Sequence, residues 1–430
     1  MKIQGTTVAT PIARRAVPDD KSVSKAPWSS KHTVDTLCPA FEESGSVVAC
    51  EPVEGYPLEV ESKIVPKQSG SGDPSPENVR PISAWTGAKL WQGGKNLLPT
   101  EEMKVAQNWF NNTISNSGYR NYPIKVKPNT TYTLSMSENG VVGSTGTELY
   151  VSLRNTIGTY WENGGICHGN GDKGYCKSVV SVVSNDEGYL YLSFYNVSQG
   201  QLDLFFSLCK DLMLEEGSVA TEYEPYRGEE ITVDFGQNVY GGSYNWKTGL
   251  LTDSMVHSVL TGTENWNALG SSWQGAGKFG CYASILEQST KSFDYKPSYS
   301  ELPCSHCIPG NWGWGSATET GLLLLNGKVV YMSFSKTALG ITDADSDAEM
   351  VEKFKAYLVG QYANGTPVEF CYVPTAEPTT AQLTPQEILA LSGVNTLYTD
   401  TGDTTVSGRA DTTAVIEKLT SAIIALGGNV

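Results

Sequence analysis

One short motif carries three residue types that could bind a metal. Cys304-Ser305-His306-Cys307 offers two thiols and an imidazole, and Cys167, His168 and Cys176 could be imagined as further ligands. A structural zinc site usually brings together two closely spaced pairs of ligands. The chain has one such pair and no second CxxC, and the other cysteines lie in a different predicted domain. We therefore predict no metal site.

Two further motifs resemble nucleotide- and calcium-binding loops. Residues 275–280 match GxGxxG, but that fingerprint needs a helix after it, and residues 281–284 are expected to form a strand. We interpret the motif as a glycine-rich turn. Asp343-Ala344-Asp345-Ser346-Asp347 resembles the start of an EF-hand, but Ala348 and Phe354 stand where that loop needs glycine and glutamate. These aspartates are better explained as acids at a helix N-terminus.

Signatures of enzymes are otherwise missing from the sequence. It contains no HExxH, no GxSxG and no Walker loop, and its four histidines fall in unrelated contexts. The two carboxylates of a glycosidase come together only in the fold, and 46 acidic residues supply chance candidates everywhere. We predict a protein that is not an enzyme, with no catalytic residues and no cofactor.

Aromatic residues in polar, Asn- and Gly-rich stretches suggest a different chemistry. Flat rings edged by amides and hydroxyls suit sugars, which present C–H faces and a rim of hydroxyl groups. Trp161 is our first candidate for a glycan-binding platform, followed by Tyr160, Trp109 and Tyr119. The alternative for each of them is ordinary core or subunit packing.

Composition limits the class of protein that could position these residues. The 430 residues carry a net charge of −16, which excludes a general nucleic-acid binder and disfavours binding to anionic lipid. We expect no secretory signal and no membrane insertion, because the apolar runs fall far short of roughly 20 residues. Nine cysteines cannot all pair, so we expect folding in a reducing cytoplasm.

Apolar residues at every second position predict a mainly β protein. Leu58, Val60 and Ile64 alternate with charged residues, and turn residues separate the short strands in a way typical of a β-sandwich. Further strands are expected at 131–136, 148–153, 189–195 and 202–208. Prolines at 11, 18, 27 and 39 predict an extended N-terminal arm over residues 1–45.

Two helices are expected among the strands. One spans residues 348–362, with Val351, Phe354, Tyr357 and Leu358 on a single face. The other begins near residue 412 and ends the chain. Its apolar residues recur at spacings of three, four and three, which indicates an oligomerisation seam; they are Ile416, Leu419, Ile423 and Leu426. The alternative is that this helix docks on its own body.

Several strings together make the chain resemble a known family. They are Trp28-Ser29-Ser30-Lys31, residues 70–82, Val239-Tyr240-Gly241-Gly242-Ser243 with Gly249-Leu250-Leu251-Thr252, Leu383-Thr384-Pro385-Gln386-Glu387 and Thr399-Asp400-Thr401-Gly402-Asp403. These strings are similar to those of minor structural, tail or fibre proteins of phages and prophages of Gram-positive bacteria. Residues 95–99 and 212–226 look like the two ends of an inserted module that resembles carbohydrate-binding, jelly-roll sandwiches.

The resemblance implies a structural adhesion protein of a phage particle that binds host surface polysaccharide. It implies an arm (1–45) that docks to other virion proteins, a β-rich body (46–94 and 228–408), the inserted sandwich (95–227) and a C-terminal oligomerisation helix (409–430). Fibres of this kind are commonly trimers, so a homotrimer is expected, assembled in the host cytoplasm and carried on the virion. A glycan depolymerase and a purely architectural decoration protein are the alternatives.

Overall fold

The protein is mainly β, as predicted, with 46% of the described residues in strands and 12% in helices. The computed structural model describes residues 40–111, 119–139, 149–157, 165–170, 173–195, 198–270, 277–290, 301–310, 321–325, 327–413, 416 and 420. Most of the expected arm lies outside these residues.

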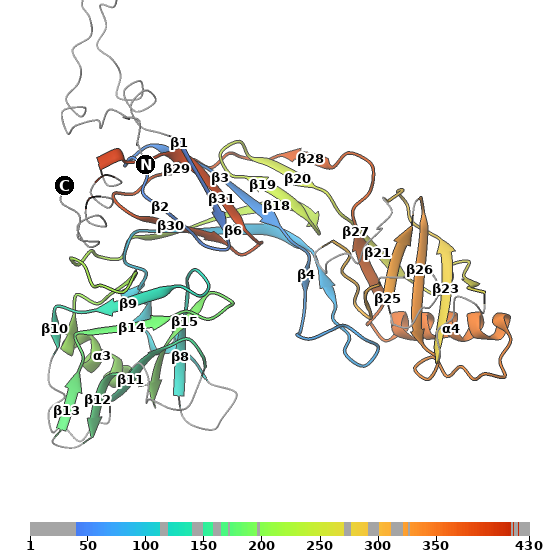
Figure 1. Ribbon diagram of the computed structural model, residues 1–430, viewed down its shortest axis with the longest axis horizontal. Helices are drawn as coiled ribbons and strands as arrows, with labels where there is room; N and C mark the ends of the chain where they lie inside the picture. Colours follow the sequence, from blue (N-terminus) through green and yellow to red (C-terminus); the bar gives the residue numbers. More distant parts are fainter. Residues whose placement is uncertain are drawn as a thin grey trace, which may run out of the picture. The chain divides into compact units, whose positions relative to one another are not determined.

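Two compact units make up the structure, and the chain passes between them several times (Figure 1). The first unit comprises residues up to 61, 89–231 and those from 387 onward, and the second comprises 62–88 and 232–386. Three of the boundaries fall inside the long strands β3 (Pro57–Ile64), β6 (Trp85–Gly93) and β18 (Gly228–Val239). Along β3 every second residue is buried, so the predicted alternation at residues 58–64 is confirmed.

In the first unit, the two ends of the described chain pair with each other. β1 is antiparallel to β31, and β30 pairs with both β2 and β6. The backbone N–H of Lys89 donates to the Asp400 side chain across 2.9 Å. The strands involved are β1 (Ala40–Gly45), β2 (Val48–Cys50), β29 (Ile388–Leu389), β30 (Asn395–Thr399) and β31 (Thr404–Arg409).

Residues 95–227 of the first unit form a group of elements with their own core (Figure 1, cyan to green). A six-stranded sheet, in the order β13-β12-β11-β15-β8-β7, and a three-stranded sheet, β14-β9-β17, both contribute to it. Every residue of that core lies between Leu97 and Leu214. The strands are β7 (Phe110–Asn111), β8 (Tyr119–Lys125), β9 (Thr131–Ser135), β10 (Glu138–Asn139), β11 (Leu149–Arg154), β12 (Gly165–Asn170), β13 (Lys173–Cys176), β14 (Val179–Val183), β15 (Tyr189–Tyr195), β16 (Cys209–Lys210) and β17 (Met213–Glu216).

The prediction of a strand at 202–208 is wrong, because these residues belong to helix α3 (Gln199–Leu208). Ser198 and Gln201 form a reciprocal capping box that satisfies the first free N–H groups of the helix. Leu202 and Phe205, three residues apart, are both buried, as helical periodicity requires. The short helices α2 (Thr100–Met103) and η2 (Ala106–Asn108) precede β7.

The two ends of segment 95–227 lie side by side. The N–H of Gly94 donates to the carbonyl oxygen of Arg227 across 2.9 Å. Next to it, the Asn96 side-chain amide donates to the carbonyl oxygens of Leu212 and Glu224, both at 3.1 Å. The chain therefore enters and leaves this segment at neighbouring points, while the apolar core of the segment closes on itself.

The second unit is built around a five-stranded sheet with the order β22-β23-β26-β25-β24. Helix α4 (Asp347–Ala363) lies across it (Figure 1), and the ring of Phe354 contacts Trp266, Phe279 and Phe334. This confirms the helix expected at 348–362. The strands that lie wholly within this unit are β4 (Lys67–Gln68), β5 (Ile82–Ser83), β19 (Gly242–Asn245), β20 (Leu250–Asp253), β21 (Val256–Leu260), β22 (Asn267–Ala268), β23 (Lys278–Ser284), β24 (Ile308–Pro309), β25 (Gly321–Leu325), β26 (Val329–Ser335), β27 (Val368–Tyr372) and β28 (Thr379–Gln382).

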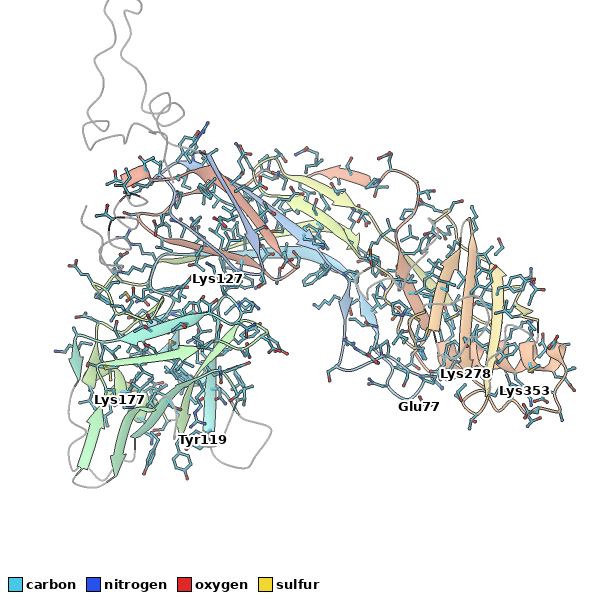
Figure 2. The ribbon with its side chains drawn as sticks, in the orientation of Figure 1. Glu77, Tyr119, Lys127, Lys177, Lys278 and Lys353 are labelled. Atoms are coloured by element: carbon cyan, nitrogen blue, oxygen red, sulfur yellow. The ribbon has the colours of Figure 1, made fainter. Side chains whose placement is uncertain are left out.

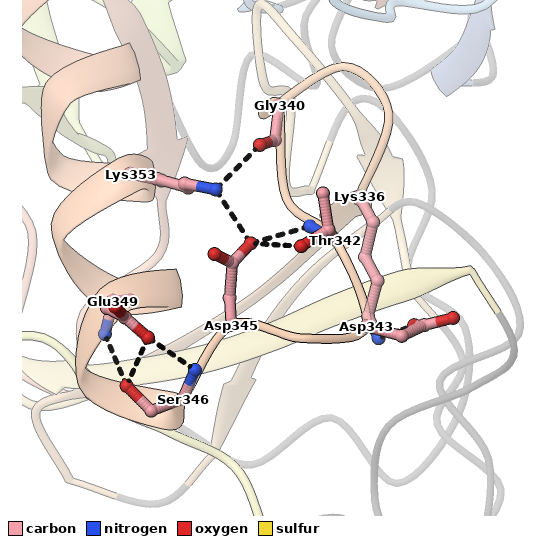
Figure 3. Close-up of polar contacts among 8 residues, drawn as sticks. All are labelled: Lys336, Gly340, Thr342, Asp343, Asp345, Ser346, Glu349 and Lys353. Atoms are coloured by element: carbon pink, nitrogen blue, oxygen red, sulfur yellow. Dashed lines mark hydrogen bonds and ion pairs between the residues drawn. The ribbon is translucent and has the colours of Figure 1, made fainter.

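The acidic cluster before α4 organises the start of this helix (Figure 3). Ser346 is the N-cap, and its hydroxyl and the Glu349 carboxylate form a capping box. Asp345 accepts hydrogen bonds from Lys353 at 2.7 Å and from the N–H of Thr342 at 2.6 Å. The bond from Lys353 lowers the pKa of Asp345 most strongly. The ionised Asp345 carboxylate therefore contributes fully to stability at neutral pH, and this contribution is lost as the pH falls through the lowered pKa of Asp345.

The capping box predicts the effect of one hydroxyl group. The Ser346→Ala substitution leaves the backbone N–H of Glu349 without its acceptor and should destabilise the second unit by about 1 kcal/mol. The melting temperature should fall by roughly 2–4 °C. Ser346→Thr keeps an accepting hydroxyl and is the matched control; equal losses in both variants would contradict the capping role.

The adjacent ends of segment 95–227 predict that the rest of the chain folds without it. Deleting 95–227 and joining residue 94 to 228 should leave a soluble protein that unfolds cooperatively, since the removed core shares no residue with the remainder. Calorimetry of the shortened chain measures this. Insoluble material or a broad, non-cooperative transition would count against an inserted module.

Candidate functional site

The six-stranded sheet has one face on the core and a second face that is polar and aromatic. Because side chains alternate along a strand, burial of Ile124, Val151 and Leu192 in the core fixes which neighbours point the other way. We call this second surface the outer face. Its residues on the three central strands are Tyr119, Asn121, Pro123 and Lys125 of β8, Tyr150, Ser152 and Arg154 of β11, and Tyr189, Tyr191, Ser193 and Tyr195 of β15.

Three tyrosines form a row across one end of the outer face. Tyr119, labelled in Figure 2, is the register partner of Tyr195, and their ring centroids are 5.1 Å apart. The ring of Tyr150 meets Tyr195 edge-on at 5.8 Å. Burial raises the pKa of Tyr119, opposed by the nearby Arg154 guanidinium. Its phenol therefore stays neutral at physiological pH, and it can both donate and accept hydrogen bonds.

A polar row follows, one step further along the same strands. Asn121, Ser193 and Ser152 are successive register partners across β8, β15 and β11. The hydroxyl of Ser193 donates to Asn121 Oδ1 at 2.6 Å, and Arg154 Nε donates to the Ser152 hydroxyl at 2.8 Å. These four residues are between 0 and 8% exposed, which is unusual for polar side chains that point away from the core.

Two donors of this row have no hydrogen-bond partner within the described part of the chain. They are Asn121 Nδ2 and Arg154 Nη2. Burial lowers the pKa of Arg154, although a guanidinium with so high a starting value keeps its charge. A buried donor without an acceptor is costly, so such groups usually bond ordered water or ligand oxygens. The row is thus a buried hydrogen-bond network beneath the tyrosines, with two donors that no described residue satisfies.

The opposite end of the outer face carries a second aromatic pair. Tyr189 and Tyr191 are stacked with centroids 6.1 Å apart, and Lys125 Nζ lies 4.4 Å from the centre of the Tyr189 ring. Lys125 also donates to the carbonyl oxygen of Glu187 at 2.7 Å. Burial lowers the pKa of Lys125 and raises that of Tyr191.

The outer face combines the groups that sugar recognition needs. Tyrosine rings offer flat apolar surfaces, and planar amide and guanidinium groups donate to neighbouring hydroxyls. None of its eleven named residues is a carboxylate.

The candidates proposed from the sequence divide between the core and the outer face. Tyr119 lies on the outer face. Trp109 is 4% exposed, donates from Nε1 to the carbonyl oxygen of Met103 at 2.8 Å and meets Phe194 edge-on at 5.1 Å. Stacking on a sugar needs an open ring face, which Trp109 does not offer, so we leave it out of the site.

The other candidates fall largely outside the described residues. Tyr160 and Trp161 lie between 158 and 164, a range that the structure does not describe. Of the proposed oligomerisation residues, Ile416 is helical and half-buried, while Leu419, Ile423 and Leu426 are outside the description.

Sequence reasoning missed most of the outer face, although a signal was present. The strand at residues 189–195 reads Tyr-Leu-Tyr-Leu-Ser-Phe-Tyr, in which tyrosine or serine occupies every position opposite the buried Leu and Phe. Aromatic residues in polar stretches are more readily interpreted as binding residues, because aromatic residues in strands are usually assigned to the core. Arg154 stands out only once the register places it beside Ser152 and Tyr191.

The cysteine motif lies in the second unit and is fully enclosed. Cys304 and Cys307 are buried, with their sulfur atoms 3.3 Å apart, and the ring of His306 bonds the Ser305 hydroxyl through Nδ1 at 2.8 Å. Among the described residues there is no group of three or more His, Cys, Asp or Glu side chains arranged to hold a metal ion.

Comparison with known proteins adds no family. No protein-family model matches the chain, and no curated protein is significantly similar to it. Within the described residues, none of the helices has the length and apolar character required to cross a bilayer.

Proposed function

We propose that this protein is a structural adhesion protein of a phage particle that binds host surface glycans. The observation that carries the glycan-binding part is the outer face, with its row of tyrosines beside the unpaired donors of Asn121 and Arg154. The phage assignment follows from the sequence resemblance. In this proposal residues 95–227 form a jelly-roll-like β-sandwich inserted into a β-rich body, and the N-terminal arm docks to other virion proteins.

Charge and valency indicate the kind of binding. A net charge of −16 repels anionic wall polymers, so neutral glycans are the expected target. A single site of this kind should bind in the millimolar to high micromolar range, where the binding free energy is about −4 to −6 kcal/mol. Several copies on one particle raise the overall avidity by about 10² to 10⁴.

Removing one ring from the tyrosine row tests glycan binding. Tyr119→Ala in the full chain should weaken binding to host wall polysaccharide at least tenfold, because the stacking surface at the end of the outer face is lost. Binding is measured by calorimetry, and the melting temperature should stay unchanged since Tyr119 lies off the core.

Tyr282→Ala is the matched control, because Tyr282 stacks on Tyr331 on strands of the second unit. It should leave binding intact. Equal loss in both variants would refute the outer-face site. If the full chain binds neither a glycan array nor host cells, the architectural alternative replaces this proposal, and release of reducing ends would indicate a depolymerase.

The resemblance to phage fibres, which are commonly trimers, leads us to propose a homotrimer held together by the C-terminal helix. The full chain should have three times the monomer mass by light scattering at micromolar concentration, and Ile416→Asp with Ile423→Asp should dissociate it, because charges at core positions of a helical seam are not tolerated. A monomeric wild-type protein would disprove the trimer. Unchanged assembly of the double variant would instead place the interface elsewhere.

A further inference from the structure

A second candidate site lies in the first unit, at a cavity of about 230 Å³. We call it the aromatic pocket. It is smaller than the roughly 300–1,000 Å³ of pockets for drug-sized ligands, so it suits a single small group. It shares Pro123 and Lys125 with the outer face but no tyrosine. Its aromatic and acidic lining residues are Trp91, Tyr122, Tyr226, Tyr398, Glu102, Glu229 and Glu230.

The rings of the pocket are held by pairing between strands. Trp91 of β6 and Tyr398 of β30 are register partners, and their rings stack with centroids 5.0 Å apart and planes 15° from parallel. Tyr122 comes from β8, and the phenol of Tyr226 lies near enough to Glu102 for that charge to raise its pKa. Four aromatic side chains thus line a space that admits only a small group.

The exposed carboxylate of Glu102 lines the pocket beside these rings and has no cationic partner among the described residues. Glu102 accepts a hydrogen bond from the Tyr122 hydroxyl at 3.1 Å, and no ion pair to it occurs among the described residues. Burial raises the pKa of Tyr122, Tyr226 and Tyr398, and the charge of Glu102 adds to the rise in each. These phenols therefore remain neutral beside the carboxylate.

The lysines near the pocket are already engaged. Lys89 donates to Glu230 at 2.8 Å, and Lys125 is held against the Tyr189 ring and the carbonyl oxygen of Glu187. Neither forms an ion pair with Glu102. Negative charge and ring faces in the pocket both favour a cation, while an anion would be repelled.

We propose that the aromatic pocket binds a protonated primary amine carried by a small molecule or by a sugar residue of the wall polymer. The carboxylate of Glu102 and the phenol oxygens accept hydrogen bonds, which a primary ammonium donates and a quaternary one does not. The phenol rings that line the pocket add attraction for the charge, whereas Trp91 already has Lys89 Nζ 5.9 Å from its ring centre. The biological source of the amine rests on the proposed function, whereas amine binding itself does not.

Two sugars that differ at one group test the proposal on the full chain. D-Glucosamine should bind, and N-acetyl-D-glucosamine, in which the amine is a neutral amide, should bind at least tenfold more weakly. Isothermal titration calorimetry or ligand-observed NMR measures both. Equal affinity for the two sugars, or no binding of glucosamine, would overturn the proposal.

Neighbouring glutamates supply the matched variants. Glu102→Gln keeps the size and removes the charge, so glucosamine affinity should fall at least tenfold. Glu101→Gln alters a residue that is 84% exposed at its side chain and bonded to Lys104, and it should have no effect. Equal loss in both variants, or none in Glu102→Gln, would refute a site at Glu102.

The two proposals can fail independently. Tyr119→Ala, which removes the outer-face ring, should leave glucosamine affinity unchanged, and Glu102→Gln should leave binding of a neutral wall glycan unchanged. If the chain binds no glycan but still selects glucosamine through Glu102, the adhesion function fails and the amine site stands. If Tyr119→Ala abolishes glucosamine binding, the amine binds at the outer face and the aromatic pocket is refuted.

Discussion

The central strand of the six-stranded sheet sets the constraint on which the candidate site depends. β15 lies between β8 and β11, and it buries Leu190, Leu192 and Phe194 in the core. A shift of one residue in its register would exchange the core and outer faces. Apolar burial therefore fixes where the tyrosines and Arg154 lie, so the geometry of the polar face is a by-product of packing on its other side.

The polar row of the outer face costs the free protein stability, because some of its donors are buried without an acceptor in the described part of the chain. Asn121, Ser193 and Ser152 are almost wholly buried; Ser193 is bonded to Asn121 and Ser152 to Arg154, while two donors of this row lack acceptors among the described residues. An apolar row would be more stable in the free protein, because it would leave no donor unsatisfied. In contrast, a preorganised network with two unsatisfied donors suits the positioning of hydroxyl groups, since its side chains are already desolvated and held in place.

Much of the fold could be predicted from the sequence, because burial leaves a periodic trace. The alternation around Leu58 and the face of α4 with Phe354 both appear as expected. The sequence predicts a strand where helix α3 lies, because the short apolar run fits either period. The signal that distinguishes them is the capping pair of Ser198 and Gln201 at the start of the helix. The site was less predictable, because register across separate strands brings Arg154 opposite Tyr191 and Tyr119 opposite Tyr195.

The bond between Gly94 and Arg227 has a mechanical consequence. Tension applied to the body of the first unit reaches the ends of segment 95–227 at two points joined by this bond and flanked by β6 and β18, which pair in one sheet. The hydrogen bonds between these two strands then carry the force, and the segment between them is not stretched. The outer face would then keep its shape under load until the ladder shears. For the adhesion protein that we propose, this position would keep the binding surface intact while flow or a moving cell pulls on the particle.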